Sequence, residues 1–138
     1  MASWVFLETE LIREGPLPNY WRAPTDNDFG NGMEKRCAVW KQASLDRTVE
    51  SFEARQINEK VVEVRTRYTF TGTEIHHQVT YTIFASGDID LTSEIDPGSS
   101  PLPEMPRFGM KMRLNKVLGE LQWYGRGPHE NYCDRYTS

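Results

Sequence analysis

The sequence has few cysteines and histidines, and their spacing matches no known ligand or disulfide pattern. The two cysteines, Cys37 and Cys133, fit no disulfide framework and no CxxC motif. We therefore expect two free thiols, and the alternative is a single disulfide between them. The three histidines are scattered and form no HExxH-like pair, so the sequence predicts no metal site.

Long apolar runs and basic blocks are also missing. No apolar run approaches the length of a membrane-spanning helix, so we expect no membrane partner. The first eight residues lack the charged start and the sustained apolar core of a signal peptide. Acidic and basic residues are mixed along the chain and the net charge is -4, so we expect no nucleic-acid partner.

The composition that remains is that of an ordinary globular protein. Hydrophobic residues make up 38% of the chain and charged residues 26%, which is too apolar for a disordered segment. The length of 138 residues suits one domain. A domain of this size buries roughly two-thirds of the surface of its unfolded chain, so a real core is expected.

Residues 32–44 are predicted to form the one short helix of the chain. Asn31 is a suitable N-cap, and Glu34 follows three residues later, as in a capping box. Apolar residues then recur at helical spacing and form one stripe. We expect this stripe to pack in the core, and the alternative is a ligand-binding surface. The stripe consists of Met33, Cys37, Trp40 and Ala43.

Most of the remaining chain alternates between apolar and polar residues, which is typical of strands that bury one face. Turn residues at 72–73 and 86–88 separate the strands of hairpins, whereas the proline-rich run 97–103 indicates a longer crossover. The two prolines in residues 15–18 are expected to end any opening strand. The fold class is therefore all-β, an antiparallel β-sandwich. The predicted strands are residues 48–55, 62–70, 75–83, 88–95, 107–114 and 117–123.

Residues 19–31 form the first of two irregular motifs, NYWRAPTDNDFGN. The run Asp26, Asn27 and Asp28 is suited to accept hydrogen bonds from its own backbone and to hold a tight turn. Arg22 is placed to form a bidentate pair with one of the carboxylates, and Gly30 tolerates a positive φ. These residues favour a structural turn fixed by an Arg–Asp pair over direct contact with a ligand. A calcium loop is disfavoured because the later ligands are missing.

Residues 122–135 form the second motif, QWYGRGPHENYCDR. Its glycines and proline force the chain out of a strand into a sharp loop. A proton-transfer pair of His129 and Glu130 is conceivable, but adjacent residues of a strand point to opposite faces. We favour a buried polar network that fixes the loop. The residues expected to fix this loop are Glu130, Asn131, Asp134 and Arg135.

Aromatic residues are concentrated in and near the two motifs. Core packing is the expected role for each, and stacking on a sugar ring is the alternative. Trp21 and Tyr132 are the best candidates for stacking because both lie in loops. The aromatic residues concerned are Tyr20, Trp21, Trp40, Trp123, Tyr124 and Tyr132.

Both motifs resemble the C-terminal domain of glycoside hydrolase family 2 β-galactosidases, also called the small chain or domain 5. The resemblance spans about residues 17–135. It implies a supersandwich of the galactose mutarotase-like type, of which residues 1–138 form a single partial domain, about the first half. It also implies a fragment of an enzyme that hydrolyses terminal non-reducing β-D-galactose residues through a galactosyl-enzyme intermediate.

The same resemblance implies that the catalytic residues lie outside this chain. In the family the acid/base and the nucleophile are glutamates of a TIM-barrel domain, so we expect no catalytic residue here and an inactive isolated fragment. A catalytic pair formed by Asp26 and Asp28 is disfavoured for the same reason. No cofactor is expected in this segment, and any Mg and Na ions of the parent would be bound by its other domains.

Gly30, Asn31 and Gly32 match the start of a mobile loop beside the sugar pocket of the family, although the sequence departs from the family after Gly30. The second motif matches a hallmark of the domain to which the resemblance gives no catalytic role. Expected partners are the remaining domains of the parent, its β-galactoside substrate and further copies of the fragment, since half a sandwich leaves open edges. The parent is expected in the cytoplasm or periplasm. The alternatives are a stand-alone carbohydrate-binding or mutarotase-like module and a purely structural scaffold.

Overall fold

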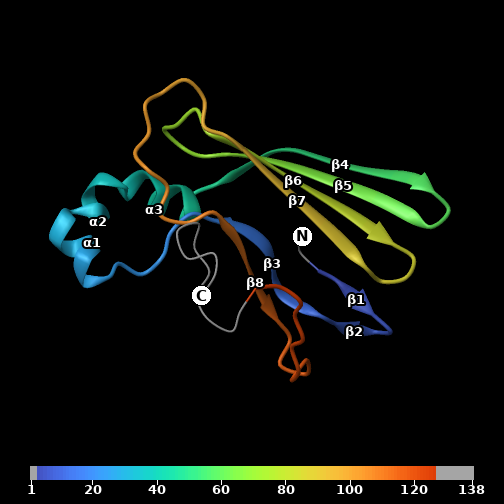
Figure 1. Cartoon of the computed structure of the whole chain (residues 1–138). Helices are drawn as coiled ribbons and strands as arrows, with labels where there is room; N and C mark the ends of the chain where they lie inside the picture. The colour runs from blue at the N-terminus through green and yellow to red at the C-terminus, as the bar shows by residue number, and fades with distance from the viewer. Residues whose placement is uncertain (1–2, 127–138) are drawn as a thin grey trace. The chain divides into compact units, whose positions relative to one another are not determined.

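The computed structural model describes residues 3–126 and divides the chain into two compact units (Figure 1). Of the described residues, unit 1 comprises 3–15 and 112–126, and unit 2 comprises 16–111. Unit 1 contains a hairpin of β1 (Val5–Phe6) and β2 (Thr9–Glu10).

No helix within residues 3–126 is long and apolar enough to cross a membrane.

The main sheet of unit 2 is a four-stranded antiparallel meander in the order β4-β5-β6-β7. Its turns lie where the sequence predicted them, with Gly72 at φ +75° and Gly87 at φ +95°. These left-handed values are accessible to glycine without strain. The strand expected only for residues 48–55 is longer than predicted. The strands are β4 (Thr48–Asn58), β5 (Val61–Thr69), β6 (His76–Phe84) and β7 (Ile89–Asp96).

A second layer contains β3 (Ile12–Asn19) paired with β8 (Gly109–Leu114), which confirms the all-β sandwich. The prediction that residues 15–18 end the opening strand is wrong, because β3 continues through Pro16 and Pro18. Among the described residues β3 has a partner strand on one side only. Proline is tolerated in such an edge strand, where its missing N–H costs no ladder hydrogen bond.

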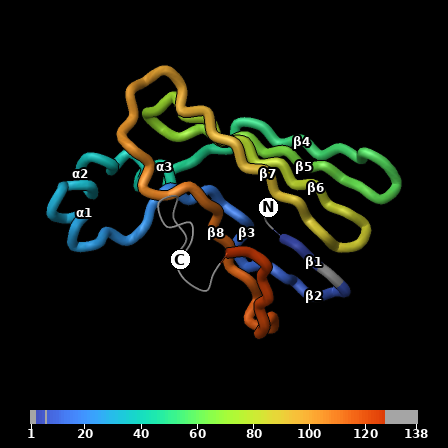
Figure 2. Tube along the Cα trace, viewed as in Figure 1, coloured from blue at the N-terminus to red at the C-terminus, as the bar shows by residue number. Residues whose placement is uncertain are grey.

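The connection between the layers follows residues 97–108, as the proline-rich run predicted. Figure 2 shows this segment passing α3 (Ala38–Leu45) on its way from β7 to β8. Trp40 Nε1 donates a hydrogen bond of 3.0 Å to the Pro103 carbonyl there. The strand predicted for residues 117–123 is wrong, since no strand is formed between residues 115 and 126. Its apolar side chains find no neighbouring strand among the described residues, and Trp123 is 72% exposed.

The single helix predicted for residues 32–44 is divided into α2 (Met33–Arg36) and α3, and a further helix, α1 (Asp26–Asn31), precedes them. Gly32 ends α1 in the left-handed conformation, with φ +71°, and Cys37 lies between α2 and α3. Asn31 is therefore not the N-cap that the sequence suggested. The apolar stripe is nevertheless buried as predicted, because all four of its residues face the core. These residues are Met33, Cys37, Trp40 and Ala43.

The core of unit 2 is built around Tyr20, which directly follows β3 and is fully buried. Its ring makes edge-on contacts with Trp40 of α3 and with Phe70, both at 5.7 Å between centroids. The inner faces of β5 and β6 supply Tyr68, Val79 and other buried side chains. The core therefore holds the start of the first motif against the main sheet.

Candidate functional site

The first motif is anchored at its beginning by Tyr20. The Tyr20 backbone N–H donates to Ser44 Oγ of α3 at 2.9 Å, and the Tyr20 hydroxyl is hydrogen-bonded to Nδ1 of His77 in β6. Asn19 Nδ2 donates to the Trp21 carbonyl at 3.1 Å. These contacts fix the direction in which the chain leaves β3, so the residues that follow are positioned by the rigid part of unit 2.

Arg22 and Asp28 form the bidentate pair that the sequence predicted. Arg22 Nη2 donates to Asp28 Oδ1 at 3.0 Å, and Arg22 Nη1 donates to Asp28 Oδ2. Asp28 is 8% exposed, so this charge is compensated inside the protein rather than by water. The Arg22 guanidinium, followed by the Thr25 backbone N–H, holds the pKa of the Asp28 carboxyl well below its usual range.

Thr25 is a residue of this site that the sequence analysis missed. It is the N-cap of α1, and its backbone N–H and hydroxyl donate to Asp28 Oδ2 at 2.8 and 2.9 Å. The Asp28 backbone N–H donates back to Thr25 Oγ1 at 3.4 Å, which completes a capping box. The signal was present in the sequence, because Thr25 and Asp28 have the spacing of that motif.

The Asp-Asn-Asp run forms the first turn of α1 rather than a separate tight turn. Thr25 supplies the cap that makes the helical conformation favourable, which explains the difference. Asp26 and Asn27 are exposed on this turn, whereas Asp28 points inward. A negative charge at Asp26 is favourable there, since the first turn of a helix carries unpaired N–H groups.

Gly30, Asn31 and Gly32 form the end of α1 and its C-cap. The predicted positive φ occurs at Gly32 and not at Gly30, which keeps a helical backbone. The Gly32 N–H donates to the Phe29 carbonyl at 3.2 Å. The Asn31 carbonyl accepts a bond of 2.8 Å from Arg36 Nη1, and Arg36 Nε donates to Glu104 Oε1 at 2.9 Å. This end of α1 is therefore tied to the crossover segment.

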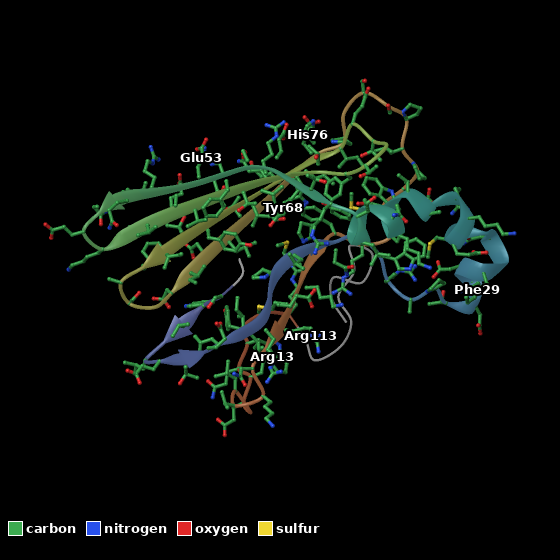
Figure 3. All side chains as sticks on the ribbon, turned by 180° about the vertical axis from the view of Figure 1, so that it is seen from behind. Arg13, Phe29, Glu53, Tyr68, His76 and Arg113 are labelled. Carbon is green, nitrogen blue, oxygen red and sulfur yellow. The ribbon has the colours of Figure 1, made fainter. Side chains whose placement is uncertain are left out.

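No side chain crowds the two glycines. A Cβ atom placed on Gly30 or Gly32 would have no heavy atom within 4 Å. Glycine at position 32 is thus required by the backbone conformation alone, and glycine at position 30 is required by neither space nor conformation. Phe29, between the Asp28 pair and these glycines, exposes 57% of its surface and projects from α1 (Figure 3).

The aromatic residues of the motifs divide into buried and exposed groups. Tyr20 and Trp40 pack in the core, as predicted. Trp21 is partly exposed, with the Lys41 ammonium 5.8 Å from its ring centroid, a cation–π arrangement. Core packing is wrong for Trp123 and Tyr124, which are exposed. Tyr132 lies outside the described residues.

The whole chain, residues 1–138, matches the family model described as β-galactosidase small chain. The chain belongs to the β-galactosidase small chain family. The family assignment agrees with the resemblance inferred from the two motifs.

Relatives named β-galactosidase match this small-chain segment over nearly its full length. The protein of Priestia megaterium is 39% identical over 98% of this chain and 13% of the relative. That of Clostridium acetobutylicum is 36% identical over 98% of this chain and 15% of the relative. That of Halalkalibacterium halodurans is 33% identical over 99% of this chain and 14% of the relative. The chain therefore spans about one seventh of the length of these relatives.

Several predicted features of the small-chain segment lie outside the described residues. They are Cys133, the His129 and Glu130 pair, and the loop-fixing residues Glu130, Asn131, Asp134 and Arg135. Cys37 is a buried free thiol, and its burial raises the pKa of the thiol. Within residues 3–126 no group of three His, Cys, Asp or Glu side chains is arranged to hold a metal ion.

Proposed function

We propose that this chain is a non-catalytic segment of a β-galactosidase that hydrolyses terminal β-linked galactose. The observation that supports the proposal most directly is the match of the entire chain to the small chain family, at about one seventh of the length of proteins named β-galactosidase. Its role would be to form a wall of the sugar pocket and to present the loop that begins at Gly30.

The geometry of the first motif suits such a role. Asp28 and its partners Arg22 and Thr25 form a fixed base, and the backbone becomes left-handed four residues later, at Gly32. A rigid support followed, one helical turn later, by a left-handed glycine would suit a segment that moves over a substrate. The exposed Phe29 ring projects from the same turn of α1.

A retaining glycosidase needs two carboxylates that flank the scissile bond. The buried Asp28 is fully engaged by Arg22 and Thr25, so it does not provide one of them. The remaining domains of the parent would supply both carboxylates, together with any bound ions. Residues 1–138 would then be one part of the small chain and not an independent enzyme.

The first experiment tests the isolated chain. Purified protein is incubated with nitrophenyl β-galactoside and, separately, titrated with galactose by NMR. We expect neither turnover nor saturable binding. Turnover at enzyme-like rates would refute the non-catalytic role, and saturable binding of galactose would favour a stand-alone carbohydrate-binding module.

The second experiment tests the loop in the complete β-galactosidase that contains this chain. Gly32→Ala is expected to lower kcat/KM, because a left-handed backbone costs a residue with Cβ about 1–2 kcal/mol and the segment would relax away from this conformation. Gly32→Asn should restore part of the loss, since asparagine tolerates this conformation. Gly87→Ala is the matched control, because Gly87 is also left-handed but lies in the turn between β6 and β7, and it should leave kcat/KM unchanged. Equal effects of Gly32→Ala and Gly87→Ala would contradict a role for the loop.

A further inference from the structure

Strand β4 is an edge of the main sheet. It is the first strand in the order β4-β5-β6-β7, so one of its sides has no partner strand within residues 3–126 (Figure 1). All eleven residues of β4 are exposed. An edge of this length presents unpaired backbone N–H and C=O groups that are able to pair with another strand.

On the inner face of the sheet, the apolar side chains continue from β5 onto the edge strand β4. Phe52 is paired with Thr66 of β5, and Val49 is paired with Tyr68. Thr66 and Tyr68 are buried, whereas Phe52 remains 64% exposed although it lies in the same row. The apolar row therefore reaches the edge without a side chain to cover it.

The outer face of β4 has an acidic and a basic residue two positions apart. Glu53 is paired with Arg65 of β5, and Arg55 with Glu63. Arg55 Nη2 lies 3.4 Å from Glu63 Oε1, but the Arg55 side chain is still 70% exposed. Glu53 has no ion pair within residues 3–126 and projects from the outer face (Figure 3).

We propose that β4 pairs antiparallel with β4 of a second copy of this chain, about a two-fold axis through Ala54. In this register Glu53 lies opposite the partner's Arg55, and Arg55 lies opposite the partner's Glu53. Opposite charges that face each other across antiparallel strands are stabilising. The pattern is self-complementary, as an isologous interface requires.

The neighbouring registers are disfavoured by charge. An axis through Glu53 would place two glutamates opposite each other, and an axis through Arg55 would do the same with two arginines. The bulges of β4, between Val49 and Ser51 and between Gln56 and Asn58, lie outside the paired run. On the inner face Phe52 would lie opposite the partner's Gln56, whose methylene groups would cover part of the ring.

The oligomeric state of the 138-residue chain tests the proposal. Sedimentation equilibrium over a range of concentrations at low salt should show a monomer–dimer equilibrium. Glu53→Arg and Arg55→Glu should each raise the dissociation constant by about tenfold or more, because both cross-strand pairs become repulsive. An equimolar mixture of the two variants should dimerise again, since one variant has two basic residues in this row and the other two acidic ones.

Two matched charge reversals serve as controls. Asp90→Arg changes the charge on the outer face of β7, at the opposite edge of the sheet, and Arg107→Glu changes it in the segment before β8. Both should leave the dissociation constant within about threefold of the unmodified value. A monomer at every concentration, a mixture of the two β4 variants that stays monomeric, or dissociation caused by Asp90→Arg would each overturn the proposal.

Discussion

His77 should make the stability of the fold sensitive to mild acid. The side chain is fully buried, and both ring nitrogens are engaged in hydrogen bonds. The Tyr20 hydroxyl is hydrogen-bonded to Nδ1, and Ser93 Oγ is hydrogen-bonded to Nε2 at 2.8 Å. Phe108 lies against the ring, with 5.8 Å between centroids and 20° between planes. Burial disfavours the charged imidazolium, so this arrangement favours a neutral imidazole.

Burial lowers the pKa of His77 from 6.5 to about 4. The unfolded chain therefore binds more protons than the folded chain between these values, and the free energy of unfolding falls as the pH falls through this range. The contribution is fully present above pH 6.5. The linkage relation gives a loss of about 2 kcal/mol between pH 7 and pH 5, and about 3 kcal/mol once the folded state is also protonated.

Urea unfolding followed by tryptophan fluorescence at pH 7, 6 and 5 measures this loss. His77→Gln removes the titrating group, so the variant should be less stable at pH 7 but should lose little further stability by pH 5. His76→Gln is the matched control, because His76 lies on the outer face of the sheet beside Glu50 (Figure 3). The loss of stability attributed to His77 should persist in this variant. Constant stability of the unmodified chain from pH 7 to pH 5, or an unchanged pH dependence in His77→Gln, would refute the reasoning.

Three further predictions concern single side chains, each measured by urea unfolding at pH 7. Tyr20→Phe leaves His77 Nδ1 buried without this hydrogen-bond partner and should cost about 1–3 kcal/mol, whereas a cost below about 0.5 kcal/mol would argue against this hydrogen bond. Thr25→Ala removes the N-cap of α1 and should cost about 1 kcal/mol, with Thr25→Ser close to neutral. Gly32→Ala should destabilise the chain by about 1–2 kcal/mol, whereas Gly30→Ala should stabilise it by about 0.5–1 kcal/mol; effects of the same sign would contradict the assigned backbone conformations.

The strands of the main sheet could be predicted because their signal is local. Alternation over residues 62–95 marks the buried face of β5 and β6, and turn residues such as Gly72 and Gly87 mark the ends of the strands. The same reasoning failed for β3, where prolines suggested an end. Proline forbids a ladder bond on its own N–H side only, and the sequence does not reveal which side of a strand is unpaired.

The helical region was recognised by its apolar stripe but not by its breaks. The spacing of Met33, Cys37 and Trp40 identifies the buried face, and that face is buried as expected. The helix nevertheless begins earlier, because Thr25 caps the Asp-Asn-Asp run, and Gly32 interrupts it. A capping box or a left-handed glycine stabilises a helix end by about 1 kcal/mol, which is enough to move a helix boundary. The spacing of apolar residues does not show these boundaries.

In the candidate site, contacts between residues close in the sequence could be predicted, whereas contacts between distant residues could not. Arg22 and Asp28 are six residues apart, and the charges alone suggested their pair, which is present. The hydrogen bond between Arg36 and Glu104 joins residues 68 positions apart, and no local sequence pattern predicts it. The end of α1 at Asn31 is therefore held by Arg36, whose other partner, Glu104, lies in the crossover segment.

The burial of His77 could be predicted from the sequence, whereas its hydrogen-bond partners and its lowered pKa could not. Alternation places it in the inner row of β6, between Ile75 and Val79, so its burial follows from the sequence. A buried imidazole is tolerated only when its nitrogens are satisfied, and here the partners come from residues 57 positions earlier and 16 positions later. The burial that these segments provide together lowers the pKa of His77. The acid sensitivity of the fold is thus a property of three segments brought together, and it should shift with changes at any one of them.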